Sequence, residues 1–166
     1  MHRTCHQGDL RKGRFSQKYG LYLVTKCVAH GHSLTAAQRC DVAQAMHYVR
    51  GSGFTLLHAF VVMPDHWHAL ISLTEACTLD QVVWKICRRA RYRWRDAVCG
   101  GYSWQEGYHD HKVREGESVV SVVRYVEANP VRKGLCEVAD EWDHSSAHRE
   151  HKAQLDRSFL GHERWA

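Results

Sequence analysis

Residues 54–73 read FTLLHAFVVMPDHWHALISL, and this stretch decides the fold. Its first half is apolar almost without interruption, which is typical of a strand buried on both faces of a sheet. Pro64 and Asp65 then predict a tight turn, because both residue types favour turn geometry. The residues after this turn predict a second strand. Together they indicate a long β-hairpin in the middle of a sheet, which places His66 and His68 on a central strand.

Strands and helices alternate on both sides of this hairpin. Two helix starts are marked by capping boxes, at Thr35 with Gln38 and at Thr78 with Gln81. The predicted elements are, in order, a strand at 21–28, a helix at 35–50, strands at 54–63 and 66–73, a helix from 78 to Gly100-Gly101, an extended piece at 108–114 and a helix at 117–129. This order predicts an α+β fold, a ferredoxin-like split βαβ sandwich with an antiparallel central sheet and an added C-terminal helix.

The chain has the length of one domain, and its sequence divides into three parts. Its 166 residues suffice to bury one hydrophobic core. Residues 1–18 are predicted to form a basic arm, residues 19–130 the folded domain, and residues 131–166 a polar, histidine-rich tail of uncertain order. Pro130 sets the last boundary, because the residue before a proline avoids helical geometry. The sequence shows neither a secretory signal nor an apolar run long enough to span a membrane, so we expect a cytoplasmic protein.

Positive charge is concentrated on one predicted helix. The net charge is +5, which favours a polyanionic partner without identifying it. Six cations fall within eleven residues and are interleaved with aromatic side chains: Lys85, Arg88, Arg89, Arg91, Arg93 and Arg95, with Trp84, Tyr92 and Trp94. The pattern is compatible both with a solvated helix face and with a nucleic-acid contact.

The cysteines argue against two classes of small protein. There are seven, an odd number, and no two have the Cys-x-x-Cys spacing. Disulfide scaffolds and zinc ribbons depend on paired cysteines, so we expect neither. The histidines and tyrosines are therefore the candidate functional residues.

Among the fourteen histidines, one pair with the spacing of metal ligands lies on the predicted hairpin. His66 and His68 are two residues apart on a predicted strand, so their side chains point to the same face. Trp67 points the other way, into the core. Two imidazoles at this spacing can bind one metal ion, or they can simply be two histidines on a half-exposed strand.

The last predicted helix carries a tyrosine on its polar face. Tyr125 and Asn129 are four residues apart and share this face with Ser118 and Ser121, while valines form the buried stripe. A tyrosine in this place can be an amphipathic residue at the edge of the core. Beside a divalent ion held by two histidines and one oxygen donor, the same phenol can act as a nucleophile towards phosphorus.

Several blocks of the sequence resemble one known family, the HUH single-tyrosine transposases. Residues 63–68, MPDHWH, resemble its Met-Pro-Asn-His-hydrophobe-His signature, and residues 125–135, YVEANPVRKGL, resemble its Tyr-x-x-x-Asn-Pro-Val-x-x-Gly-Leu block. Three further blocks are similar to family segments: WQEGYHDHKVR at 104–114, WDHSS at 142–146, and GRFS at 13–16. The last block is similar to the arm of one branch, the REP-associated tyrosine transposases. The resemblance runs from about residue 11 to residue 148 in the expected order.

This resemblance implies a specific reaction on DNA. The family cuts single-stranded DNA by attack of a tyrosine hydroxyl on a phosphodiester, and the resulting 5′-phosphotyrosine is then joined to another strand. By position, Tyr125 is the nucleophile, His66 and His68 are metal ligands, and Asn129 is the third ligand. The implied cofactor is Mg²⁺ or Mn²⁺, and the implied substrate is a repetitive extragenic palindromic (REP) hairpin with a short flanking motif. Asp65 replaces the usual asparagine and either joins the metal shell or holds the turn, and the turn is the role we expect.

We expect two basic regions to hold the DNA. Phosphate contacts are assigned first to the helix with Lys85, Arg88, Arg89 and Arg95, and second to the arm with Arg11, Lys12 and Arg14, which would suit the motif at the foot of the hairpin. Two other interpretations stay open: a non-catalytic regulator that binds hairpins, and an autonomous insertion-sequence transposase of the same superfamily. The protein is expected at the nucleoid, as a monomer or a homodimer, with the tyrosine acting in its own chain or in a partner.

Overall fold

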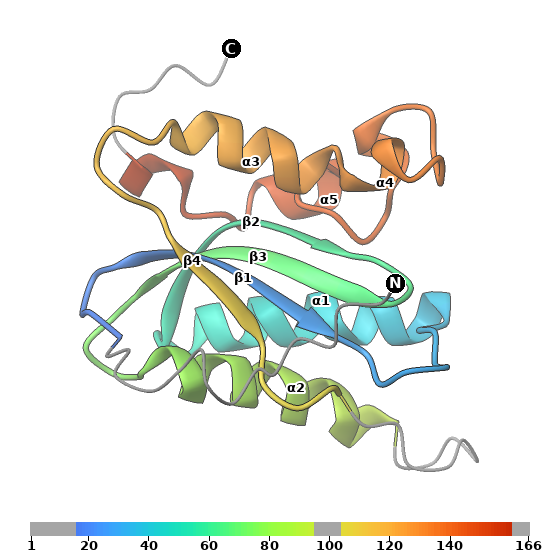
Figure 1. Ribbon diagram of the computed structural model, residues 1–166, viewed down its shortest axis with the longest axis horizontal. Coiled ribbons are helices and arrows are strands. Elements are labelled where there is room, and N and C mark those ends of the chain that lie inside the picture. Colours follow the sequence, from blue (N-terminus) through green and yellow to red (C-terminus); the bar gives the residue numbers. More distant parts are fainter. Residues whose placement is uncertain (1–15, 95–103, 161–166) are drawn as a thin grey trace, which may run out of the picture.

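A four-stranded antiparallel sheet forms the centre of the computed structural model, which describes residues 16–94 and 104–160. The strands are β1 (Leu21–Cys27), β2 (Thr55–Val62), β3 (His66–Leu73) and β4 (His109–Lys112). Their order across the sheet is β2-β3-β1-β4, so β3 pairs with β2 on one side and with β1 on the other. The predicted hairpin and the central position of the histidine strand are therefore confirmed (Figure 1).

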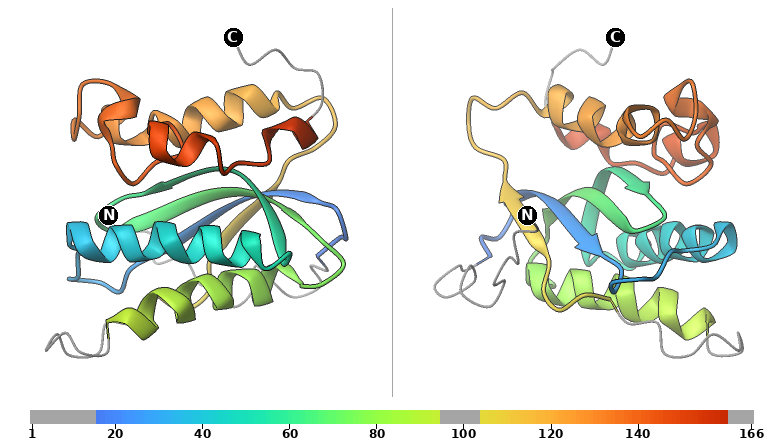
Figure 2. Two further views of the ribbon diagram at one scale, coloured as in Figure 1. Left: turned by 180° about the vertical axis from the view of Figure 1, so that it is seen from behind. Right: turned by 45° about the vertical axis from the view of Figure 1, so that its right-hand side comes forward.

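Helices cover both faces of this sheet (Figure 1). α1 (Ala36–Gly51) and α2 (Leu79–Arg93) pack together on one face, which completes the predicted ferredoxin-like sandwich. Both begin at the predicted capping boxes, with Thr35 and Thr78 as the N-cap residues. α3 (Val119–Glu127) lies on the other face and is the predicted added helix (Figure 2). Within the described ranges, no helix has both the length and the apolar character that crossing a membrane requires.

Alternation along β3 sends its side chains into two separate cores. Trp67 and Ile71 point towards α1 and α2 and are almost completely buried there. Leu70 points to the opposite face and packs with valines of α3. His66 and His68 lie at even positions like Leu70, so the fold places them between the sheet and α3.

A proline divides the last helical segment without ending it. The sequence predicts that the helix stops before Pro130, but α3 ends at Glu127 and a short helix, α4 (Asn129–Arg132), follows directly. Pro130 lies in the first turn of α4, where its missing N–H costs no hydrogen bond. The domain boundary predicted after residue 130 therefore falls inside this helix.

The residues after α4 line the outer edge of β2. The backbone N–H of Val62 donates to the carbonyl oxygen of His144 (2.8 Å), and that of Ser146 donates to the carbonyl oxygen of Phe60 (2.8 Å). Three short helices follow one another in this segment: η2 (Ala139–Glu141), α5 (Arg149–Lys152) and η3 (Arg157–Leu160). The sequence predicts a tail of uncertain order over residues 131–166, whereas its described part is an ordered cover for an edge strand. This segment is attached to β2 by backbone hydrogen bonds, which do not depend on side-chain type. The sequence therefore shows no hydrophobic pattern that would predict the attachment.

Candidate active site

Two imidazole rings meet on the face of β3 that α3 covers. The Nε2 atoms of His66 and His68 are 3.2 Å apart, and the two ring centroids are 4.7 Å apart. His68 is buried, whereas His66 is partly exposed. The convergence expected from the two-residue spacing is therefore present.

Each ring is held through its other nitrogen. Thr25 lies directly opposite His68 in the register of β1 and β3, and its hydroxyl oxygen is 2.7 Å from Nδ1 of His68. A carboxylate oxygen of Asp65 is 2.6 Å from Nδ1 of His66. A ring that offers its Nε2 lone pair carries its proton on Nδ1 and donates it to such an oxygen. The carboxylate of Asp65 therefore favours the tautomer of His66 that leaves Nε2 available to a metal ion, and the hydroxyl of Thr25 can accept from Nδ1–H in the same tautomer of His68.

The contact made by Asp65 differs from the role expected of it. The sequence favours an aspartate that holds the turn, with the metal shell as the alternative. In the structure its carboxylate faces the His66 ring, in the manner of a carboxylate–histidine–metal arrangement. Asp65 thus orients a candidate ligand from its place in the turn.

Burial keeps the ring of His68 neutral. The pKa of His68 is lowered from 6.5 to about 4, chiefly by loss of solvent around the ring and then by charge repulsion from His66. Near neutral pH the ring is therefore unprotonated. The neutral imidazole is the form that binds a metal ion.

The histidine pair fits two neighbouring positions of a divalent ion. Ligands about 2.1 Å from an octahedral ion lie about 3.0 Å apart when they occupy adjacent positions. This separation is close to the 3.2 Å between the two Nε2 atoms. In the part of the chain that the structure describes, no third histidine, cysteine or carboxylate completes a cluster with them. The other positions would fall to an amide, to water or to phosphate oxygens of a substrate.

Tyr125 of α3 lies next to this pair. Its ring centroid is 5.9 Å from that of His68, and the residue is 42% exposed. The guanidinium of Arg132 lies over the tyrosine ring, with Cζ 5.0 Å from the ring centroid. Val126, the next residue, is completely buried in the core beneath α3 and anchors the helix there. One chain thus brings the predicted nucleophile and the two predicted ligands together.

Asn129 lies one helical turn after Tyr125 and is buried. Its amide nitrogen is 3.5 Å from the carbonyl oxygen of Tyr125, a long contact within the same helical segment. The role of Asn129 as the third ligand stays a prediction.

The position of α3 depends on the C-terminal segment. Glu127 at the end of α3 accepts hydrogen bonds from the hydroxyl of Ser146 (2.8 Å) and from the guanidinium of Arg157. Trp142 donates its indole N–H to the carbonyl oxygen of Val62 on β2 (3.0 Å). The first and last residues of the WDHSS block therefore connect α3 and the edge of the sheet.

Sequence reasoning misses three residues of this region: Thr25, Glu127 and Arg132. Thr25 is recognised only through its cross-strand register with His68, which hydropathy does not encode. Arg132 follows Tyr125 by seven residues, a spacing that places both residues on the same helix face. This spacing is the sequence signal from which Arg132 could have been identified. The partners of Glu127 come from a segment without a helical or strand pattern of its own.

The predicted DNA-contacting cations of α2 lie across the sheet from this site (Figure 2). Each cation of α2 that the structure describes among them stacks on an aromatic ring: Lys85 on Phe54, Arg88 on Trp84 and Arg89 on Tyr48. The remaining predicted contacts lie outside the described residues, namely Arg11, Lys12, Arg14 and Arg95. The cations of α2 are therefore not part of the site around Tyr125.

Comparison with known proteins connects this site to one family. The sequence profile of a family described as IS200-like transposases matches residues 14–129. A REP-associated tyrosine transposase of Escherichia coli K12 is 28% identical over 95 residues, which cover 57% of this chain and 55% of the relative. A Haemophilus influenzae protein assigned to the same class is 28% identical over 112 residues, which cover 58% of this chain and 61% of the relative. The chain thus spans less than two thirds of the length of either relative.

The fold is shared with a solved structure. A REP-associated tyrosine transposase bound to a REP hairpin superposes with a TM-score of 0.69 at 22% sequence identity. The match covers 86% of this chain and 85% of the other chain. The likeness concerns the fold, and it agrees with the four-stranded sheet and its helices.

Proposed function

This chain belongs to the IS200-like transposase family, and on that premise we propose that it is a metal-dependent endonuclease and strand transferase for single-stranded DNA. The observation that carries the proposal is the geometry within one chain. The ring of Tyr125 lies 5.9 Å from that of His68, whose Nε2 converges with the Nε2 of His66. The proposed substrate is a REP-type hairpin with a single-stranded flank, and a REP hairpin is the ligand named for the relative with the same fold.

Tyr125 supplies the nucleophile of this reaction. Its hydroxyl oxygen attacks phosphorus and forms a 5′-phosphotyrosine, while the bond from phosphorus to the 3′-oxygen breaks. The tyrosine loses its hydroxyl proton and the departing 3′-oxygen gains one, so protons balance. Attack by a 3′-hydroxyl on the phosphotyrosine reverses these bond changes and joins two strands. The covalent intermediate conserves the phosphodiester energy, so no nucleotide cofactor is required.

His66 and His68 would hold the divalent ion, with Asn129 as the third protein ligand. When bound, Mg²⁺ or Mn²⁺ polarises the scissile phosphate and stabilises charge on the leaving oxygen. Thr25 and Asp65 would keep the two imidazoles in the orientation that binding requires, and the carboxylate also favours the metal-binding tautomer of His66. Nitrogen ligands suit Mn²⁺ better than Mg²⁺, so we expect the higher activity with Mn²⁺.

Arg132 adds positive charge beside the nucleophile. Its guanidinium lies over the ring of Tyr125, so it restrains the ring by a cation–π contact. A guanidinium in this place also attracts a phosphate towards the tyrosine hydroxyl. We therefore assign Arg132 to the positioning of both reactants.

Covalent capture of DNA tests the proposal. A REP-type hairpin strand with a single-stranded flank is labelled at its 3′ end, incubated with the protein and Mn²⁺, and resolved on a denaturing gel. We expect a labelled protein band, because a 5′-phosphotyrosine retains the 3′ fragment. Tyr125→Phe should abolish this band, and His68→Ala should weaken it by about a hundredfold or more.

Tyr48→Phe is the matched control for the loss of a tyrosine hydroxyl. Tyr48 is exposed and lies on α1, across the sheet from Tyr125, so its variant should give the same band as the unmodified protein. A band that persists in Tyr125→Phe would assign the chemistry to another residue. Hairpin binding without any band would identify a non-catalytic regulator.

A further inference from the structure

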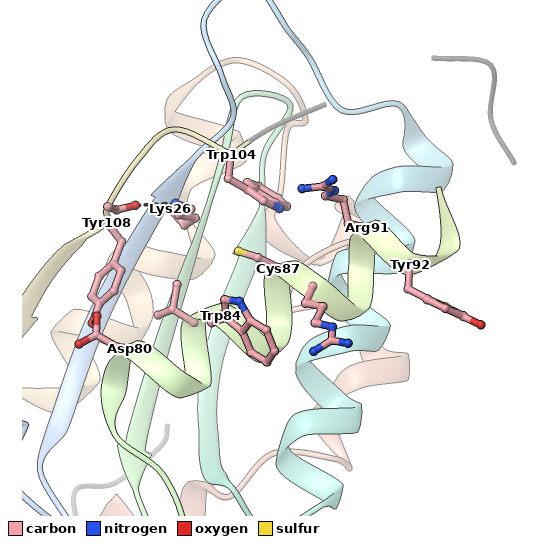
Figure 3. Close-up of a pocket in the computed structure, with 11 residues that line it drawn as sticks. Lys26, Asp80, Trp84, Cys87, Arg91, Tyr92, Trp104 and Tyr108 are labelled. Atoms are coloured by element: carbon pink, nitrogen blue, oxygen red, sulfur yellow. Dashed lines mark hydrogen bonds between the residues drawn. The ribbon is translucent and has the colours of Figure 1, made fainter. Parts of the chain in front are cut away.

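A cavity of about 750 Å³ lies on the far side of the sheet from Tyr125, between α2 and the segment that leads into β4 (Figure 3). Its wall combines aromatic and basic side chains from three parts of the chain. The lining residues include Lys26 of β1, Trp84, Arg88 and Arg91 of α2, and Trp104 and Tyr108 before β4. The proposed chemistry at Tyr125 leaves all of them without a role.

Aromatic rings form opposite sides of this cavity. Trp84 is 55% exposed, a large exposed fraction for an indole ring. Figure 3 shows Trp104 and Tyr108 on the segment that faces α2, with Trp84 on the helix itself. The hydroxyl of Tyr108 donates to Asp80 (3.0 Å), which fixes that ring against the helix. Such walls accept a flat ligand by stacking.

Positive charge lies at the rim of the cavity. Arg88 stacks on Trp84 with Cζ 4.8 Å from the ring centroid, and Arg91 is exposed one turn further along α2. In the described ranges, no ion pair joins either guanidinium to a carboxylate. Lys26 donates instead to two backbone carbonyl oxygens of the segment before β4 and so shapes the floor. A flat ligand with anionic groups on both sides matches this distribution.

The cavity and the histidine pair lie on opposite faces of the sheet, on either side of β1. Thr25 and Lys26 are consecutive, so their side chains point to opposite faces of the sheet. Thr25 contacts His68, whereas Lys26 lines the cavity. β4 is an edge strand of four residues, and the segment that borders the cavity leads directly into it. A strand of DNA that joined the two sites would run round this edge.

We propose that this cavity binds one unpaired base of the single-stranded flank while the adjoining backbone reaches Tyr125. The inference rests on the proposed function, because it assumes a single-stranded DNA substrate. The base stacks on Trp84, and Arg88 and Arg91 contact the phosphates on either side of it. Stacking accepts every base, so the cavity contributes affinity and sets the register of the strand more than it reads sequence.

Photocrosslinking locates the bound base. The Tyr125→Phe protein, which binds without cutting, is mixed with an oligothymidylate that carries one 5-iodouracil and is then irradiated. Mass spectrometry of the crosslinked peptides should find the adduct on Trp84 or, across the cavity, on Trp104 or Tyr108. Adducts found only outside the cavity would overturn the proposal.

Binding of the same oligothymidylate measures what the cavity contributes. At constant salt, Trp84→Ala should weaken binding about tenfold, and Arg91→Ala should lower both the affinity and its salt dependence. Tyr48→Ala is the matched control, because Tyr48 is 52% exposed and stacked with Arg89 but does not line the cavity. Equal losses of affinity in Trp84→Ala and Tyr48→Ala would indicate nonspecific binding to exposed aromatic residues and would contradict a base-binding site. Thermal unfolding of Trp84→Ala, whose side chain is half exposed, verifies that the fold is intact.

The base site and the proposed chemistry fail in different ways. A protein that forms the covalent adduct at Tyr125 but gives no crosslink in the cavity contradicts the base site alone. A protein that crosslinks in the cavity but never forms the covalent adduct contradicts the proposed chemistry alone.

Discussion

One hydroxyl group from a neighbouring strand determines how His68 presents its Nε2 atom. Thr25 and His68 face each other in antiparallel register, with the hydroxyl oxygen 2.7 Å from Nδ1. The ring is buried, so an Nδ1–H without an acceptor would be costly. By accepting from Nδ1–H, Thr25 satisfies this nitrogen and leaves Nε2 free to bind a metal ion.

Replacing Thr25 by valine keeps the shape of the side chain and removes this acceptor. We expect Thr25→Val to weaken Mn²⁺ binding about tenfold, because a ligand without its supporting hydrogen bond loses its orientation. Calorimetric titration of the protein without DNA measures the affinity. Thr25→Ser restores a hydroxyl and should recover most of the loss. Equal affinities for the valine and serine variants would show that the hydroxyl does not orient the ring.

The candidate ligands follow from the sequence, whereas their supporting residues do not. The pairing of His66 with His68 follows from alternation along a strand, and that of Tyr125 with Asn129 follows from helical spacing. Thr25 is 43 residues away from His68 and meets it only through the register of two strands. Register depends on the packing of whole faces, so no local pattern encodes this contact.

The helix that carries Tyr125 is held to the sheet by polar contacts at its C-terminal end. Glu127 accepts hydrogen bonds from Ser146 and Arg157, and both Glu127 and Arg157 are mostly buried. Removing the carboxylate takes away the acceptor of the Ser146 hydroxyl and one acceptor of the Arg157 guanidinium, whose Nε also donates to the carbonyl oxygen of His58. The contact between α3 and the C-terminal segment is therefore weakened.

Glu127→Ala should therefore lower the free energy of unfolding by about 1–3 kcal/mol. Urea denaturation measures this change, and covalent capture of DNA should fall more than Mn²⁺ binding does, because Tyr125 is displaced while the histidines on β3 are not. Glu115→Ala is a charge-matched control at an exposed turn position and should leave stability unchanged. Equal stabilities for the two variants would show that Glu127 does not anchor α3.

Elements with local signals were predictable, and those without them were not. Capping boxes at Thr35 and Thr78 mark helix starts because their hydrogen bonds close within four residues. The cover on the edge of β2 is built from backbone pairing and single anchors such as Trp142, so its polar sequence indicates only a tail. The predicted helix end at Pro130 was wrong for a related reason. A proline is unfavourable in a helix interior but favourable in the first turn of a helix, and the sequence alone does not show which of these positions it occupies.

Buried histidines make the stability of the whole domain depend on pH. Burial is the main cause that lowers the pKa of His47 and that of His144 from 6.5 to about 4, and it lowers the pKa of His58 as well. Below about pH 6.5 the unfolded chain takes up protons that the folded chain does not. The contribution of these rings to stability is thus present above this pH and is lost as the pH falls towards 4.

The thermal unfolding midpoint should accordingly decrease between about pH 7 and about pH 5, a range in which ordinary carboxylates stay ionised. Differential scanning calorimetry of the metal-free protein measures it. His47→Gln removes one of the titrating rings and should make the decrease smaller. A midpoint that stays constant over this range would contradict the burial of neutral histidines.

Tyr125 and the histidine pair come together within one chain. Tyr125 and His68 of the same chain are in ring contact, so catalysis should not require a second chain. Tyr125→Phe and His66→Ala should each be inactive in covalent capture, and an equimolar mixture of the two should stay inactive. Recovery of about a quarter of the activity in the mixture is the statistical yield of exchanged subunits, and it would show that the tyrosine acts on a partner's histidines.

Peptide mapping of the trapped protein–DNA complex tests the role of Tyr125 without relying on any variant. The complex formed with the labelled hairpin strand and Mn²⁺ is digested with nuclease and protease, and the modified peptide is sequenced by mass spectrometry. The predicted result is a 5′-linked nucleotide on the hydroxyl of Tyr125. A nucleotide on any other residue, or cut strands that accumulate with free 5′-phosphates and no protein adduct at any time, would contradict it.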